Sequence, residues 1–235
     1  MQGSEHGSVR ICFAVPSIKE AESFAEAGNF AFSAGTVTVG RVGKRQVNIL
    51  ITGAGIPDAL NNLALAIERT FLPRLVVHAG IAGSYDEAFP PGSVVIVKKD
   101  SFADVGVFHD NRIHSLAERK LTGLDVFPYS DGWIDIPGAE EWAEKLGLPC
   151  VNALTVATAC SPLLVNNRKK ADAVIETMEG ASVALFCRSR NIHLVHVRAI
   201  SNFVSESDSR RWNFGSAFAA LRHAITGILD LTGEI

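Results

Sequence analysis

The stretch RLVVHAGIAGS, residues 74–84, decides the fold class. It begins as a largely apolar pattern, LVVHA, and runs into a glycine-rich segment that continues to Gly92. An apolar run that does not alternate with polar residues is typical of a strand covered on both faces of its sheet. We therefore expect residues 74–80 to form a buried strand and residues 80–92 to form a loop at its carboxyl end.

Strand and helix patterns alternate on both sides of this segment. Strands are predicted at residues 9–15, 36–40, 45–52, 93–99, 149–159 and 192–204, and helices at 17–28, 57–70, 173–190 and 212–231. Ser17 and Gly28 bound the first helix, and Pro57 suits the first turn of the second. Residues 108–138 give no clear pattern. The alternation predicts an α/β fold, a single domain of residues 1–235, with three layers and a mixed, largely parallel central sheet flanked by helices.

Composition and charge narrow the class of protein. The 235 residues are 47% hydrophobic and 20% charged, as in globular proteins, and the net charge is -3. The basic residues are scattered, so no surface for nucleic acid is expected. The chain shows neither a leader-like start nor a run of about 18 apolar residues. We expect a cytoplasmic protein that binds neither nucleic acid nor a membrane.

Neither a metal nor a cofactor is expected. The four cysteines are far apart and form no C-x-x-C pair, which is more typical of small buried side chains than of disulfides or zinc ligands. His193 and His196 lie three apart on a predicted strand and would point to opposite faces. The segment GAGIPD (53–58) has Asp58 in the place of the third glycine of a dinucleotide motif, and it follows a hairpin arm.

Two close glycine pairs follow predicted strands, where ligands of such sheets bind. They are Gly53 with Gly55, and Gly80 with Gly83. Glycines let the backbone approach a ligand closely. A tight turn without a ligand explains either pair equally well.

Four segments, in this order and at this spacing, resemble the nucleoside phosphorylase and nucleosidase superfamily. They are VVHAGIAGS (76–84), FADVGV (102–107), TMEGASVALFC (177–187) and VRAISNFV (197–204). Within it the chain is most similar to the futalosine hydrolases, and next to the methylthioadenosine/S-adenosylhomocysteine nucleosidases. The resemblance covers nearly the whole chain. It implies a purine nucleoside phosphorylase-like fold and release of hypoxanthine from futalosine in the alternative menaquinone pathway.

The resemblance also implies catalytic and sugar-binding residues. Glu179 would accept hydrogen bonds from the ribose hydroxyls, as a carboxylate can, and Met178 would pack on the sugar. Without the resemblance, Glu179 reads as a helix N-terminal residue stabilised by the helix dipole. Glu20 would orient and deprotonate the attacking water; Glu22 is its competitor, and a solvated helix face is the alternative. Asn202 would contact the leaving purine.

Two departures from relatives bear on the substrate. Adenine-cleaving nucleosidases keep an aspartate where this chain has Asn202. An amide can donate to a 6-oxo oxygen and accept from a ring N–H, which favours hypoxanthine over adenine. Ile81 stands where many relatives have a hydroxyl residue, and the start of the chain lacks the phosphate-binding pattern of phosphorylases. Both absences favour water over phosphate as the nucleophile.

Further substrate contacts are implied around the ribose and the base. The backbone of Gly80, Ile81 and Gly83 would line the ribose. Ser201 and Arg198 would help to hold the base loop or the water. A structural ion pair behind the site is an equal alternative for Arg198.

The remaining candidates lie on loops. Thr158 is a candidate for a base contact. Phe108 occupies the place where relatives borrow a loop from the neighbouring subunit, so it would pack on a partner's substrate; a core position is the alternative. We therefore expect a homodimer or a higher homo-oligomer. Trp212, with Arg210 and Arg211, is hypothesised to face the 5' end of the substrate, although simple helix docking explains Trp212 as well.

Three functions stay open at this point. The first is a futalosine hydrolase. The second is another nucleosidase or a phosphorylase of the same superfamily, which phosphate dependence and the released base would separate from the first. The third is a non-catalytic protein that binds a nucleoside and shows no turnover.

Overall fold

The computed structural model describes residues 11–70, 72–110, 112–116, 118–121, 125–160 and 172–233. The strands are β1 (Ile11–Val15), β2 (Glu26–Ala27), β3 (Val37–Val42), β4 (Arg45–Ile51), β5 (Leu75–Ser84), β6 (Val94–Phe102), β7 (Gly106–His109), β8 (Arg112–Ser115), β9 (Tyr129–Ser130), β10 (Trp133–Asp135), β11 (Cys150–Thr155), β12 (Ala173–Thr177) and β13 (His193–Phe203). The helices are α1 (Ile18–Phe24), α2 (Ile56–Arg69), α3 (Ala139–Leu146), α5 (Gly180–Ser189) and α6 (Phe214–Thr232), with a 3-10 turn at Ser209–Arg211.

The central sheet closes on itself. β5 pairs with β13 and β12, β12 with β11, β11 with β6, and β6 with β13, so that these five strands form a ring. β5 runs parallel to β1 and β13 but antiparallel to β12, and β6 runs antiparallel to β13. The prediction of a mixed sheet is therefore confirmed, whereas the prediction that the sheet is largely parallel is not. The short connection from β5 to β6 holds no crossover helix, so the chain turns back on itself.

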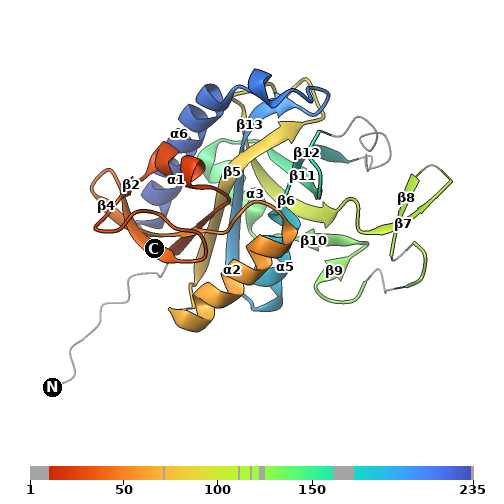
Figure 1. Ribbon diagram of the computed structural model, residues 1–235, viewed down its shortest axis with the longest axis horizontal. Helices are drawn as coiled ribbons and strands as arrows, with labels where there is room; N and C mark the ends of the chain where they lie inside the picture. The colour runs from red at the N-terminus through yellow and green to blue at the C-terminus, as the bar shows by residue number, and fades with distance from the viewer. Residues whose placement is uncertain are drawn as a thin grey trace.

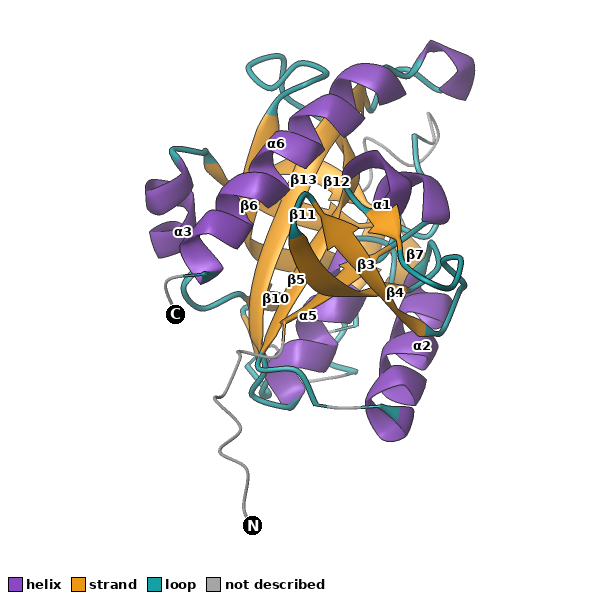
Figure 2. Ribbon diagram, turned by 90° about the vertical axis from the view of Figure 1, so that its left-hand side faces the viewer, coloured by secondary structure: helices purple, strands orange, loops and turns teal. Residues whose placement is uncertain are grey.

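Two groups of helices cover this sheet (Figure 1, Figure 2). α6 packs against α1 and α3 and against β5, β6 and β13, whereas α5 packs against α2 and against β10 and β11. The α/β architecture with flanking helices is thus confirmed. The β7–β8 hairpin forms a separate two-stranded sheet and extends away from the central one (Figure 1).

Specific residues were predicted at the ends of the first two helices, and the structure confirms some of them. Ser17 caps α1, because its hydroxyl accepts a hydrogen bond from the backbone N–H of Glu20. The helix ends at Phe24 and not at Gly28, since the following residues form β2 and pair with β3. Pro57 lies in the first turn of α2, as expected.

The first part of the glycine-rich stretch, residues 80–84, is strand and not loop, whereas residues 85–92 form the predicted loop. β5 continues to Ser84, and its small residues lie between two neighbouring strands. Gly80 is opposite Arg198 of β13, and Gly83 is opposite both Asn202 of β13 and Glu176 of β12. The absent side chains leave room for these three large polar neighbours.

The segment 173–190 also differs from its prediction. Its first part forms strand β12, and the helix begins only at Gly180. The β-branched residues Val174, Ile175 and Thr177 favour a strand, whereas the small residues from Gly180 onward suit a closely packed helix. Glu179 therefore lies at the junction of a strand and a helix.

The core is apolar but encloses a polar cluster. Fully buried side chains such as Phe13, Ile49 and Ile96 are typical of its composition. Charged and imidazole side chains are buried among them: His78, Asp100, Glu179, His196 and Arg198. Buried groups of this kind are costly unless they are paired, so their clustering indicates a functional site.

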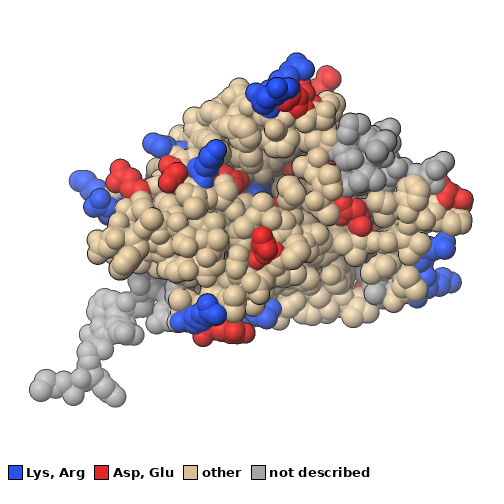
Figure 3. Space-filling model, viewed as in Figure 1, with Lys and Arg blue, Asp and Glu red and all other residues tan. Residues whose placement is uncertain are grey.

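The surface carries no strong single-sign patch on the face seen in Figure 1. Lysine and arginine side chains there are interspersed with aspartate and glutamate (Figure 3). Within the part of the chain that the structure describes, no helix is long and apolar enough to cross a membrane.

Candidate active site

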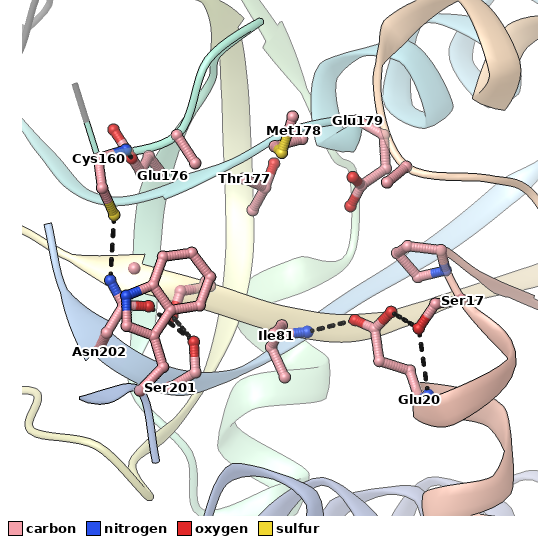
Figure 4. A pocket seen from close by; sticks show the side chains of 16 residues that line it. Ser17, Glu20, Ile81, Cys160, Glu176, Thr177, Met178, Glu179, Ser201 and Asn202 are labelled. Atoms are coloured by element: carbon pink, nitrogen blue, oxygen red, sulfur yellow. Dashed lines mark hydrogen bonds between the residues drawn. The ribbon is translucent and has the colours of Figure 1, made fainter. Parts of the chain in front are cut away.

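A cavity of about 260 Å³ lies where β5, β12 and β13 end and where the loops after β1, β4 and β11 meet. This agrees with the expectation that ligands bind beyond the ends of strands. Its wall has one end with Ser17, Glu20 and Glu179 and an opposite end with Cys160, Glu176 and Asn202, as Figure 4 shows. Ile81, Gly83, Met178, Ser201 and Trp212 also line it.

Glu20 is held by two donors and points into the cavity. Its Oε1 accepts a hydrogen bond of 2.9 Å from the backbone N–H of Ile81, and its Oε2 accepts one of 2.6 Å from Ser17 Oγ. Burial raises the pKa of Glu20 above its ordinary value of 4.5, and the nearby charge of Glu179 raises it further. Glu22 is exposed on the same helix, so Glu20 and not its competitor reaches the cavity.

Glu179 is the second buried carboxylate at this end. It occupies the N-cap position of α5, but its side chain makes no capping hydrogen bond. Its Oε1 instead forms an ion pair with Arg198, 2.9 Å from Nη1, and lies 3.8 Å from His78 Nε2. An ion pair, and not the helix dipole alone, therefore fixes this carboxylate at the cavity wall.

Arg198 lies behind the cavity and contacts the buried polar side chains there. Its Nε donates to His196 Nε2 at 2.8 Å, and its Nη2 contacts the ring of His78 at 2.7 Å. Burial, reinforced by the guanidinium charge, lowers the pKa of both histidines well below 6.5, so the rings are neutral and can accept. Arg198 does not line the cavity, and its contacts match the ion-pair alternative.

Gly80 allows this arrangement because it has no side chain. A Cβ at residue 80 would collide with the guanidinium of Arg198 and would lie 2.8 Å from Glu20 Oε1. Gly80 therefore belongs to the site through the space that it leaves open, although it is not among the residues that line the cavity.

The opposite end is built around Asn202. Its Oδ1 accepts from Ser201 Oγ at 2.8 Å, and its Nδ2 donates to the carbonyl of Phe203 at 2.9 Å and to Cys160 Sγ at 3.2 Å. Glu176 lies on the same end and is buried. This end offers amide and carboxylate groups, which suit the polar edge of a heterocyclic base.

Trp212 reaches the cavity but its neighbouring arginines do not line it. The indole Nε1 donates to the carbonyl of Glu206 at 3.0 Å. Arg211 pairs with Glu206 and Arg210 with Asp208, and both arginines are exposed. Their contact with the 5' end of a substrate stays a prediction.

Two predicted contacts fall outside the cavity. Thr158 is exposed and does not line it. Phe108 is 61% exposed on the β7–β8 hairpin, so it does not occupy a core position within this chain. Its contact with a partner's substrate, and the homo-oligomer that this requires, stay predictions.

Several residues of the site were missed from the sequence. Glu176 and Ser17 line the cavity, and His78 and His196 hold Arg198 from behind. A histidine inside the apolar run VVHAG was a usable signal, because a buried imidazole needs a partner. Glu176 gave no signal, since its orientation depends on how β12 pairs with β5.

Asp100 extends the polar cluster away from the cavity. Its Oδ1 accepts from the backbone N–H of Ser101 and from Thr155 Oγ1, whereas Oδ2 has no hydrogen-bond partner among the described residues. Burial raises the pKa of Asp100 to about 7. Nowhere in the described ranges do three histidine, cysteine, aspartate or glutamate side chains gather as metal ligands would.

Comparison with known sequences finds relatives over most of the chain. The sequence model of the phosphorylase superfamily matches residues 10–230. The chain is 29% identical over 154 residues to the futalosine hydrolase of Streptomyces coelicolor, an alignment that covers 64% of this chain and 63%, under two thirds, of that enzyme. It is also 29% identical over 192 residues to the futalosine hydrolase of Thermus thermophilus, covering 78% of this chain and 81% of that enzyme.

Comparison with solved structures finds the same architecture. The futalosine hydrolase of Helicobacter pylori superimposes with a TM-score of 0.73 at 16% sequence identity, covering 97% of this chain and all of that one. At this level of identity the likeness establishes the fold.

Proposed function

The chain belongs to the phosphorylase superfamily, and on that premise we propose that it hydrolyses the N-glycosidic bond of futalosine and releases hypoxanthine. The names of its relatives support a nucleosidase of this kind, and futalosine would connect it to menaquinone synthesis. The observation that carries the proposal is one cavity with two buried carboxylates, Glu20 and Glu179, at one end and Asn202 at the other.

The carboxylate end serves the sugar and the water. Cleavage of the bond places positive charge on the ribose, which nearby carboxylates stabilise. Glu179, fixed by Arg198, accepts hydrogen bonds from the ribose hydroxyls. Glu20 takes a proton from the attacking water, and its raised pKa brings it closer to the pH at which a general base is most effective.

Asn202 serves the leaving base. Of its contacts, the one from Nδ2 to Cys160 Sγ is the weakest kind, because sulfur is a poor acceptor. The 6-oxo oxygen of hypoxanthine can replace that sulfur and receive the amide N–H. An adenine presents an amino donor in the same place, which does not match this donor.

Water is the proposed nucleophile, and phosphate is disfavoured. No lysine or arginine is among the described residues that line the cavity. Arg198 lies directly behind the cavity, but its guanidinium already pairs with Glu179 and contacts two histidines. A phosphate dianion placed beside Glu20 and Glu179 would meet like charges without a free cation to compensate them.

A release assay tests this function. Purified protein is given futalosine, inosine or methylthioadenosine, each with and without phosphate, and free base is followed by chromatography. We expect hypoxanthine from futalosine at the same rate with and without phosphate, and much slower release from inosine. Adenine as the main product, or a need for phosphate, contradicts the proposal; no release from any substrate favours a binding protein.

A further inference from the structure

Glu176 is a carboxylate in the cavity wall that the proposed mechanism does not use. It is only 2% exposed and lies on β12, three residues before Glu179. Burying a carboxylate costs free energy, so Glu176 needs hydrogen-bond partners that offset this cost.

The protein holds both oxygens of Glu176 by hydrogen bonds. Oε2 accepts a hydrogen bond of 2.6 Å from the hydroxyl of Tyr85, and Oε1 accepts one of 2.7 Å from the backbone N–H of Cys160. Each carboxylate oxygen has two lone pairs. Among the described residues, the group therefore keeps acceptor capacity and is oriented before any ligand enters.

Glu176 and Asn202 flank the same small space over Gly83. An atom in the position of a Cβ on Gly83 would lie 3.3 Å from Asn202 Nδ2 and 3.6 Å from Glu176 Cγ. The strand register explains this, since Gly83 is opposite both residues. The amide of Asn202 and the side chain of Glu176 thus flank the same space at the Asn202 end of the cavity.

We propose that Glu176 is a specificity-determining residue, which accepts the N1–H of a 6-oxopurine while Asn202 donates to O6. This rests on the proposed function, in which a purine leaves from this end of the cavity. The pair of protein groups complements the adjacent acceptor and donor of hypoxanthine. Adenine carries a lone pair on N1, which would face the carboxylate, so Glu176 excludes it.

The test measures binding of free bases by calorimetry, with hypoxanthine, adenine and 1-methylhypoxanthine as probes. For the wild type we expect hypoxanthine to bind most tightly. Glu176→Gln should weaken hypoxanthine binding by about 10- to 100-fold, as for a lost hydrogen bond to a charged group, with little change for adenine. Methylation at N1 should weaken binding much less in Glu176→Gln than in the wild type.

Two further variants separate recognition from a structural role. Tyr85→Phe removes a hydrogen bond to Glu176 but keeps its carboxylate, so hypoxanthine should still bind more tightly than adenine. If Glu176 only holds Tyr85 and the Cys160 backbone, Glu176→Gln will weaken both bases by the same factor, and the inference is overturned. If Glu176→Gln does not fold, Glu176→Asp keeps the charge on a shorter stem and must reduce the preference for hypoxanthine.

The binding assay does not depend on cleavage, so two failures can be told apart. If the wild type cleaves futalosine but Glu176→Gln binds hypoxanthine and adenine more weakly by the same factor, only this inference is overturned. Glu176-dependent preference for hypoxanthine, without release from futalosine, supports the inference and sinks the proposed substrate.

Discussion

Arg198 shows how much of the site depends on one buried side chain. Its guanidinium joins Glu179 to His78 and His196, and none of these groups meets solvent to any extent. Removing one partner of such a network leaves a buried charge without compensation. Stability and function are therefore linked at this residue.

We predict that Arg198→Met lowers the free energy of unfolding by about 3 to 5 kcal/mol, because Glu179 is left buried and unpaired. Urea denaturation measures the loss. Arg210→Met is the matched control: Arg210 is exposed and pairs with Asp208, and an exposed pair contributes about 1 kcal/mol or less. Equal losses in the two variants would show that the buried network is not what holds Glu179.

At the scale of elements, the first turn of α1 does two things at once. The hydroxyl of Ser17 accepts from the backbone N–H of Glu20 and donates to the carboxylate of the same residue. The first bond caps the helix, and the second favours the ionised form of Glu20 and so lowers its pKa, against the larger effect of burial.

Ser17→Ala should therefore change both stability and pH dependence. Loss of the cap should cost about 1 kcal/mol of unfolding free energy. Loss of the donor raises the pKa of Glu20 further, so the base is protonated at a higher pH. The acidic limb of kcat/KM should move to higher pH, measured as base release across a pH series.

Ser23→Ala is the control for this shift. Ser23 is on the same helix and donates to the backbone carbonyl of Glu20, not to its carboxylate. In Ser23→Ala the acidic limb of kcat/KM should lie at the same pH as in the wild type. An acidic limb that is the same in Ser17→Ala and the wild type would mean that Glu20 is not the titrating base.

Most elements around the cavity could be predicted from the sequence, whereas α3 and the strands β7 to β10 could not, and two wrong assignments have a common cause. Caps and turn residues such as Ser17 and Pro57 act locally, so their predictions hold. Residues 80–84 and 173–177 were assigned wrongly because they become strand through pairing with distant segments. The resemblance supplied Glu20, Glu179 and Asn202, whereas Glu176 depends on register and could not be found in the pattern.

For the whole molecule, closure of the sheet is what assembles the site. Glu20 follows β1, Glu179 follows β12 and Asn202 lies on β13, and the ring through β5 brings the three to one cavity. The pairings that close the ring join residues far apart in the chain. Periodicity reports only on local structure, so it predicted most of these strands but not the pairings that close the ring.

The most direct test of the account uses two glutamates that only the fold distinguishes. Glu20 and Glu22 lie on the same short helix, yet one is buried in the cavity and the other faces solvent. The measurement is kcat for release of hypoxanthine from futalosine, in phosphate-free buffer, by Glu20→Gln and Glu22→Gln. We predict a loss of about 10²- to 10⁴-fold for Glu20→Gln and a rate near the wild type for Glu22→Gln. Equal rates in the two variants would contradict the account.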